Sequence, residues 1–358
     1  MKKIALLGAT GTVGRFTLEK LLSHPNAKNF RVVLGGRVRA ELERLSMEYG
    51  RRFKQALDIH QYSLEDRPSL RPIIEPSAVA INCAGPCAVT GQAVLGVALN
   101  CKVPLIDPSS EVGWLEQLSQ RTAAVKEAGV CVVSGLGVES GVAELAAVSA
   151  SKGADVHTIR VLYVMQDLEE SPGMRAAVLE NLKQPCRAYV ERSLQPVKVV
   201  GTKHEFKWDG GAMTGKNVPA ADAVLLPWGL PNVRNVNTFR IFEGKHGMVW
   251  SMLGSPLASV GMMMMQSWAK GGERPLSDRS RFLVIIEMEG AKGRRYAIVQ
   301  ANGFYEKTAA LLTEAAMRLC DDEGTKPRGV LSPSQAFGAD KLLAAAGLEV
   351  QVAEGAPA

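Results

Sequence analysis

The sequence lacks the cysteine and charge patterns of metal-binding, disulfide-bonded and nucleic-acid-binding proteins. Its 6 cysteines form no C-x-x-C pair and no cysteine–histidine cluster with the spacing of zinc ligands. Scattered cysteines in apolar surroundings are typical of reduced core thiols, so we expect a cytoplasmic protein without a metal. The 42 Lys and Arg against 36 Asp and Glu give a net charge of +6 with no run of like charges. This balance argues against nucleic-acid binding.

Long apolar runs are also scarce. The basic start, residues 1–3, is followed by only 4 apolar residues before Gly8, which is too few for a signal peptide. Residues 248–268 are almost free of charge and have the length of a membrane span, but glycines, a proline and serines interrupt them. We therefore expect no membrane span. A buried helix, a subunit interface or the wall of a hydrophobic substrate pocket remain open for this stretch.

The first forty residues predict the start of a dinucleotide-binding unit. An apolar strand at residues 4–7 leads into a glycine turn and then an amphipathic helix, and a second strand follows at residues 31–34. Gly8 allows a sharp turn, Gly11 lets the backbone approach a pyrophosphate, and Gly14 lets the helix lie close to the sheet. The pyrophosphate would sit at the helix N-terminus. The cofactor contacts predicted along this turn are Gly8, Ala9, Thr10, Gly11, Thr12 and Val13.

No acid follows the second strand, where NAD-selective enzymes usually bind the ribose hydroxyls. The strand ends instead in Gly36 and Arg37, with Arg39 close behind. An arginine fork fits a 2′-phosphate, so NADP(H) is favoured over NAD(H), unless Arg37 is only a solvated loop residue. A third strand is expected at residues 53–59. Asp58 at its end is either an adenine contact or a turn aspartate.

The remaining chain predicts two domains. A strand at residues 78–83 ends in Ala84, Gly85 and Pro86, which should face the nicotinamide half of the cofactor. In all, six strands alternate with helices over residues 1–150, as in a doubly wound parallel (Rossmann) sheet. Residues 151–305, with a helical stretch at 173–194, read as an α+β domain on a mostly antiparallel sheet. Residues 306–350 read as helices that return to the first domain.

The sequence does not supply the catalytic residues of two other enzyme classes, the short-chain dehydrogenases and the semialdehyde dehydrogenases. None of the tyrosines has a lysine four residues later, which excludes short-chain dehydrogenase chemistry. Semialdehyde dehydrogenases need a cysteine nucleophile, but Cys131 falls inside a predicted buried strand, where a thiol is inert. Cys87 follows a proline in a turn and is either a reactive thiol or a plain turn cysteine.

Several turns resemble those of the saccharopine dehydrogenase-like proteins. The resemblance rests on Asn-Cys-Ala-Gly-Pro at residues 82–86, Pro-Leu-Ile-Asp at 104–107 with Glu111 after it, the glycine turn at 135–141, and Gly-Val-Leu-Ser-Pro at 329–333. It covers residues 1–150 well and 305–350 loosely. Pro-Leu-Ile-Asp lacks the family's frequent aromatic before the aspartate, and Pro-Ser-Ser replaces a small residue and glycine.

This resemblance implies an NADP-dependent oxidoreductase that transfers a hydride to or from a C–N centre of a small amino-acid-like or polyamine-like substrate. Enoyl reduction of a hydrophobic or carrier-bound substrate and a non-catalytic NADP(H)-binding sensor or scaffold are the alternatives. An imine needs a proton to accept hydride readily, and Glu111 and Glu139 are the candidate donors. Arg160, Arg175 or Arg240 could hold a substrate carboxylate. We expect a homodimer.

Overall fold

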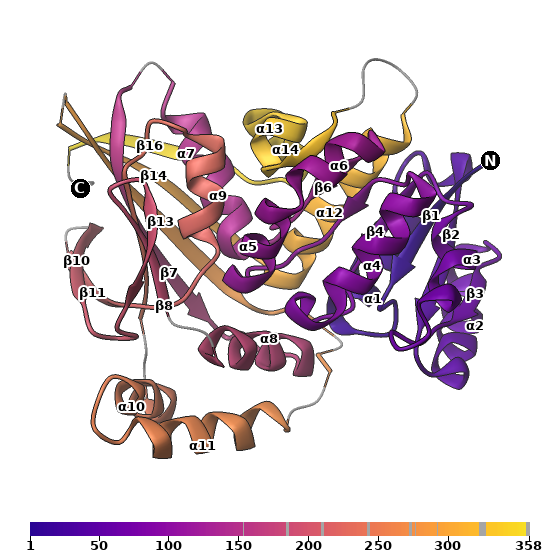
Figure 1. Cartoon of the computed structure of the whole chain (residues 1–358), viewed down its shortest axis with the longest axis horizontal. Helices are drawn as coiled ribbons and strands as arrows, with labels where there is room; N and C mark the ends of the chain where they lie inside the picture. Colours follow the sequence, from indigo (N-terminus) through magenta and orange to yellow (C-terminus); the bar gives the residue numbers. More distant parts are fainter. Residues whose placement is uncertain are drawn as a thin grey trace.

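The computed structural model describes residues 1–355 apart from 153, 184–185, 209–210, 242–243, 272–273, 276, 292 and 322–326, and it does not describe the side chains of residues 244–247. Two β-sheets lie on opposite sides of the molecule, with helices between and around them (Figure 1).

The first sheet is parallel and has the strand order of a dinucleotide-binding fold. Its order is β15-β6-β5-β4-β1-β2-β3. The strands are β1 (Lys2–Leu7), β2 (Phe30–Gly36), β3 (Asp58–Gln61), β4 (Val79–Asn82), β5 (Leu105–Ile106), β6 (Cys131–Val133) and β15 (Gly329–Leu331). Strands β1 to β6 confirm the predicted doubly wound sheet. Strand β15, from near the end of the chain, adds a seventh strand beside β6.

Helices cover both faces of this sheet and bury its apolar side chains. Helices α1 and α2 join one core cluster, together with α12 from the C-terminal region, while α3 to α6 join the other. Their bounds are α1 (Thr12–Ser23), α2 (Arg39–Phe53), α3 (Arg71–Ile74), α4 (Cys87–Cys101), α5 (Val112–Gln120), α6 (Thr122–Ala128) and α12 (Phe304–Cys320).

The predicted third strand is wrong by several residues. Helix α2 continues to Phe53, and β3 begins only at Asp58. Asp58 therefore lies at the amino end of its strand, where Lys3 Nζ donates to its carboxylate at 3.3 Å. Ligands bind beyond the carboxyl ends of such strands, whereas Asp58 pairs with Val33 in the middle of β2, three residues before the end of that strand.

The second sheet has nine strands and is mostly antiparallel, as predicted. Its order is β10-β11-β12-β7-β13-β14-β16, with β8 and β9 branching from β12, and only β7 and β12 pair in parallel. The bounds are β7 (Val156–Gln166), β8 (Cys186–Val190), β9 (Ser193–Val197), β10 (Lys203–Trp208), β11 (Gly211–Asn217), β12 (Asn235–Arg240), β13 (Arg281–Gly290), β14 (Gly293–Asn302) and β16 (Gln351–Glu354). Helices α7 (Ala143–Ala150) and α9 (Asp222–Gly229) pack against it.

The helix predicted at residues 173–194 is shorter in the structure. Helix α8 (Pro172–Lys183) ends at Lys183, and the hairpin of β8 and β9 occupies the rest of the predicted stretch. Residues 184–185 lie outside the described part of the chain. Glu191 and Arg192 make the hairpin turn with positive φ values of 44° and 66°. Such turns usually contain Asn-Gly, so the sequence carried no clear hairpin signal here.

The C-terminal region contacts both domains. Helix α12 packs against α1, and α14 (Ala339–Ala345) packs against α7. Helix α13 (Pro333–Phe337) begins with a capping box of Ser332 and Gln335. Strand β15 extends the first sheet and β16 extends the second.

Residues 248–268 form parts of two helices. Helices α10 (Gly244–Leu253) and α11 (Ala258–Ala269) project as a separate lobe below α8 (Figure 1). The turn between them contains Gly254 and Pro256, which explains the break in the apolar stretch. In the described part of the chain, every helix is too short or too polar to cross a bilayer.

Candidate functional site

A cavity of about 170 Å³ lies at the carboxyl edge of the first sheet, bordered by elements of both domains. Residues 11–13 at the start of α1 form one end of its wall. The turns after β4, β5 and β6 and the first turns of α8 and α12 contribute most of the rest. Most of the exposed lining is apolar, including Met174, Phe304 and Tyr305. Glu111 and Glu139 also reach this cavity, so the structure brings both candidate acids to the cofactor edge.

The glycine turn at the start of α1 fits a pyrophosphate. Gly8 has a φ of +71°, and a Cβ there would stand 2.5 Å from the backbone nitrogen of Ala84. A Cβ on Gly14 would stand 2.2 Å from the Gly8 carbonyl oxygen. Gly11 is the N-cap of α1 and no side chain caps the helix, so its first N–H groups are available to an anion. The buried Thr12 hydroxyl has no protein partner either.

Arg37 borders a second hollow, at the end of β2. The side chain is exposed, and Gln61 Nε2 donates to the Arg37 carbonyl oxygen at 2.9 Å. Tyr62, Ser63 and Ser69 line the same hollow. Arg37 supplies the cation that a 2′-phosphate requires. Asp66 also lines the hollow, and the hydroxyls of Ser63 and Ser69 donate to Glu65 and to the Ser63 carbonyl oxygen. The sequence did not predict residues 61–69 as part of this hollow, because β3 begins at Asp58, several residues later than the predicted strand.

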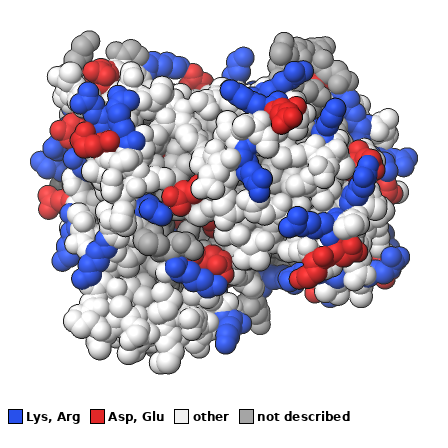
Figure 2. Space-filling view, viewed as in Figure 1, with Lys and Arg blue, Asp and Glu red and all other residues white. Residues whose placement is uncertain are grey.

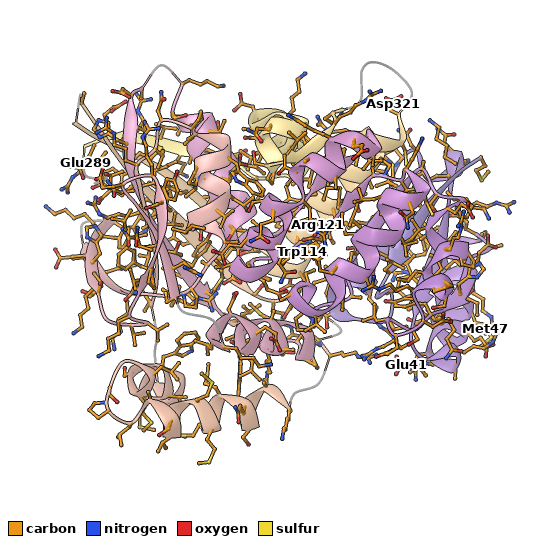
Figure 3. The ribbon with its side chains drawn as sticks, viewed as in Figure 1. Glu41, Met47, Trp114, Arg121, Glu289 and Asp321 are labelled. Atoms are coloured by element: carbon orange, nitrogen blue, oxygen red, sulfur yellow. The ribbon has the colours of Figure 1, made fainter. Side chains whose placement is uncertain are left out.

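Arg39 is engaged within its own helix. Its Nε donates to Glu43 at 2.8 Å, in an exposed pair one helical turn apart. Another arginine, Arg274 on the connection between α11 and β13, reaches the glycine turn instead. Its Nη1 donates to the Thr10 carbonyl oxygen and to Glu41, both at 3.1 Å. The hydrogen bond from Arg274 holds the pKa of Glu41 below its usual value, and Figure 3 labels Glu41 on α2.

Glu111 holds the turn after β4 against the sheet. Its carboxylate accepts from the backbone N–H groups of Cys87 at 2.7 Å and Ala88 at 2.9 Å, at the start of α4. Burial raises the pKa of Glu111 to about 7, although these donors oppose the rise. The adjacent residues 84–86 are fixed further, since Asn82 accepts from the Ala84 N–H at 3.2 Å. Both oxygens of Glu111 are thus occupied by the helix that follows the turn.

Asp107 supports the neighbouring turn after β5. It is fully buried and accepts from Ser134 Oγ at 2.6 Å, Trp114 Nε1 at 3.0 Å and the Ser109 N–H at 2.9 Å. Burial raises its pKa. Trp114 lies on α5 in the middle of the molecule (Figure 3). These bonds join the turns after β5 and β6, which carry Glu111 and Glu139.

Glu139 lies on a strained turn between β6 and α7. The next residue, Ser140, has a φ of 67°, a conformation rare for residues with a side chain. The Ser140 N–H donates to the Tyr163 hydroxyl at 2.7 Å, and that hydroxyl donates to the buried Asp222 at 2.8 Å. Burial raises the pKa of Asp222 to about 6. The network anchors the turn. Glu139 is therefore held where the main cavity meets another cavity, which is separate from the hollow beside Arg37.

The second of these cavities continues from Glu139 into the α+β domain. Arg240 at the end of β12 forms an ion pair with Glu139, and the Arg240 side chain is only 16% exposed. Burial lowers the pKa of Arg240 to about 10. The other walls are mainly apolar, with Val178, Val218 and Trp250 among them. Arg160 and Arg175 have other partners: Glu287 and Glu289 for Arg160, and the Trp268 ring for Arg175.

Cys87 has the environment of a structural thiol. It is 3% exposed, and burial raises its pKa well above the usual value. A protonated buried thiol is a poor nucleophile, so the site offers no activated cysteine at this turn. Within the described residues, no cluster of three His, Cys, Asp or Glu is suited to hold a metal ion.

The nucleotide-binding segment belongs to a known domain family. Residues 4–133 match the saccharopine dehydrogenase NADP binding domain. The first part of the chain is therefore a saccharopine dehydrogenase-like domain whose cofactor is NADP, as the resemblance implied. A protein of Caenorhabditis elegans named "Lipid droplet localized protein" is 30% identical over 147 residues, which cover 40% of this chain and 34% of that protein. The match thus spans about a third of this relative.

Two solved structures resemble the whole chain more distantly. An amine dehydrogenase from Mycobacterium smegmatis has 9% identity and a TM-score of 0.49, over 95% of each chain. A meso-dapdh mutant with DAP, from Clostridium tetani, has 12% identity and a TM-score of 0.45, over 94% of each chain. Likeness at this level carries no argument about substrate or reaction.

Proposed function

We propose that this protein is an NADP(H)-dependent oxidoreductase that transfers a hydride to or from the carbon of a C–N bond. The observation that carries this proposal is the Glu139–Arg240 pair in a largely apolar cavity that begins at the cofactor turn. Bound NADP(H) supplies or accepts the hydride. The chain then needs to position a substrate and to support the charge on its nitrogen.

Glu139 suits the nitrogen of such a substrate. A carboxylate in surroundings of low polarity stabilises a protonated imine, which accepts hydride more readily than the neutral form. Ser110 Oγ donates to Glu139 at 3.4 Å, and the strained turn fixes the position of the carboxylate. Glu111 is less suited to this role, because backbone donors of α4 occupy both of its oxygens.

Arg240 suits an anionic group on the same substrate. Its Nε is buried without a partner, and the guanidinium faces a cavity that contains few other charges. A substrate carboxylate could share the guanidinium with Glu139 through charge-assisted hydrogen bonds. The pair together offers one acceptor and several donors, which matches a small amino-acid-like molecule better than a polyamine without an acid group.

Enoyl reduction is the second candidate, and the apolar walls of both cavities favour it. Met174, Ala177, Val178 and Trp250 would suit an acyl chain better than a polar metabolite. An enoyl thioester has no basic nitrogen and would make no use of the negative charge on Glu139. The third candidate, a sensor, would bind NADPH without turnover.

A substrate panel separates these candidates. NADPH oxidation is followed by its near-ultraviolet absorbance with amines plus 2-oxoacids, amines plus aldehydes, and enoyl thioesters of increasing chain length. The proposal expects turnover with an amine and a carboxylate-bearing carbonyl compound. Turnover with enoyl thioesters alone would support the second candidate, and tight binding without turnover across the panel would support the sensor.

A further inference from the structure

The lobe formed by α10 and α11 has an apolar and partly unpartnered surface. Residues 248–269 contain no charged side chain. The inner face packs against the body of the protein: Trp250 and Met265 join Val218 in a small buried cluster, with Val178 and Leu182 of α8 beside it. The lobe is therefore a packed part of the domain, and its outer face needs a separate explanation.

That outer face exposes large apolar side chains along one stripe. Leu257 precedes α11 and is 55% exposed, and Val260, Met263 and Met264 on the helix are 41%, 63% and 38% exposed. Their spacing of three and four residues places them on the same side of α11. Met248 on α10 is 54% exposed. Figure 2 shows this lobe, at the lower left, as an almost colourless surface between charged regions.

The stripe is too small to hold a second protein by itself. Helix α11 has 12 residues, so a stripe along it is about 18 Å long and about 10 Å wide, on the order of 200 Å². A lasting protein dimer buries about 800 Å² on each partner. The stripe also lacks charged groups that would fix the register of a partner. A lipid surface needs neither a large matched area nor a register.

Positive charges flank the lobe. Lys216 Nζ donates to Ser251 Oγ on α10 at 2.8 Å, and Lys203 stands directly opposite Lys216 across β10 and β11. Like charges directly opposite each other on paired strands, such as these two lysines, repel each other. Lys270, immediately after α11, is exposed. One acid, Glu205, lies two residues from Lys203, so the flank has a cationic excess that complements anionic headgroups.

We propose that the outer face of the α10–α11 lobe docks on an anionic phospholipid surface, with α11 lying in the plane of the headgroups. Met263 and its neighbours enter the apolar layer, and the flanking lysines remain at the level of the phosphates. The inner face of the same lobe supplies Trp250 to the second cavity. Docking thus brings the wall of the substrate site next to the lipid, whatever reaction the site performs.

Vesicle flotation of the full-length protein tests this proposal. Vesicles contain phosphatidylcholine alone or mixed with phosphatidylserine. We expect flotation with the mixed vesicles, weaker flotation with phosphatidylcholine, and a decrease at high salt. Met263→Glu should reduce the bound fraction about tenfold or more, because a charge replaces an apolar side chain that enters the apolar layer of the membrane. NADPH binding by the variant checks that it is folded.

Met47→Glu is the matched control. Met47 is 57% exposed on α2, on the other side of the molecule (Figure 3), and its replacement should leave flotation unchanged. Absence of wild-type flotation with both vesicles would overturn the proposal, as would an equal loss in both variants. A dimer that Met263→Glu dissociates, without any flotation, would identify a second copy of the chain as the occupant instead.

Discussion

Arg37 is the residue on which the choice between NADP(H) and NAD(H) depends in this account. It is exposed beside Tyr62, Ser63 and Ser69, and the sequence offers no acid at the end of β2. Its position is well defined by sequence, because a strand, a glycine turn and a helix set the distance to the next strand end. The sequence does not define the positions of Ser63 and Ser69 in the same way. They follow β3, which begins several residues later than predicted.

Arg37→Asp should weaken NADPH binding by about 10- to 100-fold, because charge-assisted hydrogen bonds contribute about 1.5–3 kcal/mol. NADH lacks the 2′-phosphate and should bind almost as before. Titration of cofactor fluorescence measures both affinities. Arg51→Asp, near the other end of α2, is the control with the same charge change. An equal loss for both cofactors would contradict the phosphate role of Arg37.

Glu144 on α7 is a buried acid whose role is structural. It is fully buried and accepts from the Ser334 N–H at 3.1 Å, at the start of α13. Burial raises the pKa of Glu144 from 4.5 to about 7. The folded state therefore holds this proton more tightly than the unfolded chain, and its contribution to stability is full below pH 4.5 and is lost as the pH rises through 7.

Glu144→Gln should flatten this pH dependence. The shift corresponds to on the order of 3 kcal/mol, so the wild-type free energy of unfolding should fall by more than that of the variant between pH 4.5 and 7. Denaturant unfolding at several pH values measures both. Glu127→Gln, exposed on α6, should follow the wild type. Parallel curves for wild type and Glu144→Gln would show that the buried proton is not there.

The connection from α11 to β13 is the element that brings the second domain to the cofactor turn. Arg274 contacts both the Thr10 carbonyl and Glu41, and it lines the main cavity next to residues 11–13. Its position at the turn allows the guanidinium to face a bound pyrophosphate. No local pattern predicts this contact, because it joins residues more than two hundred positions apart.

Arg274→Ala should weaken NADPH binding by about two- to tenfold, a modest loss because the side chain is partly exposed. Glu41→Gln should weaken it less or tighten it, since Glu41 competes for the same guanidinium. Arg279→Ala, on the same connection, serves as control. If Arg274→Ala bound NADPH as well as the control does, the guanidinium would be a contact within the protein alone.

At the level of the whole molecule, the sequence predicted the two sheets better than the space between them. Alternating apolar strands and helices identify a doubly wound sheet, since both faces must be covered, and the turns at its carboxyl edge follow from strand order. The pairing of Glu139 with Arg240 depends on how the second sheet docks on the first. No local pattern encodes that contact, nor the addition of β15 and β16 to different sheets.

The proposed reaction is a hydride transfer to carbon in that space, and an isotope label tests it most directly. NADPH deuterated at the transferable nicotinamide position is incubated with the protein and an active amine–carbonyl pair from the substrate panel. We expect deuterium on the carbon bonded to nitrogen. Glu139→Gln should lose about 100-fold or more in rate with NADPH binding retained, whereas Glu180→Gln on α8 should keep the wild-type rate. A product without deuterium on that carbon, or full activity in Glu139→Gln, would contradict the proposed reaction.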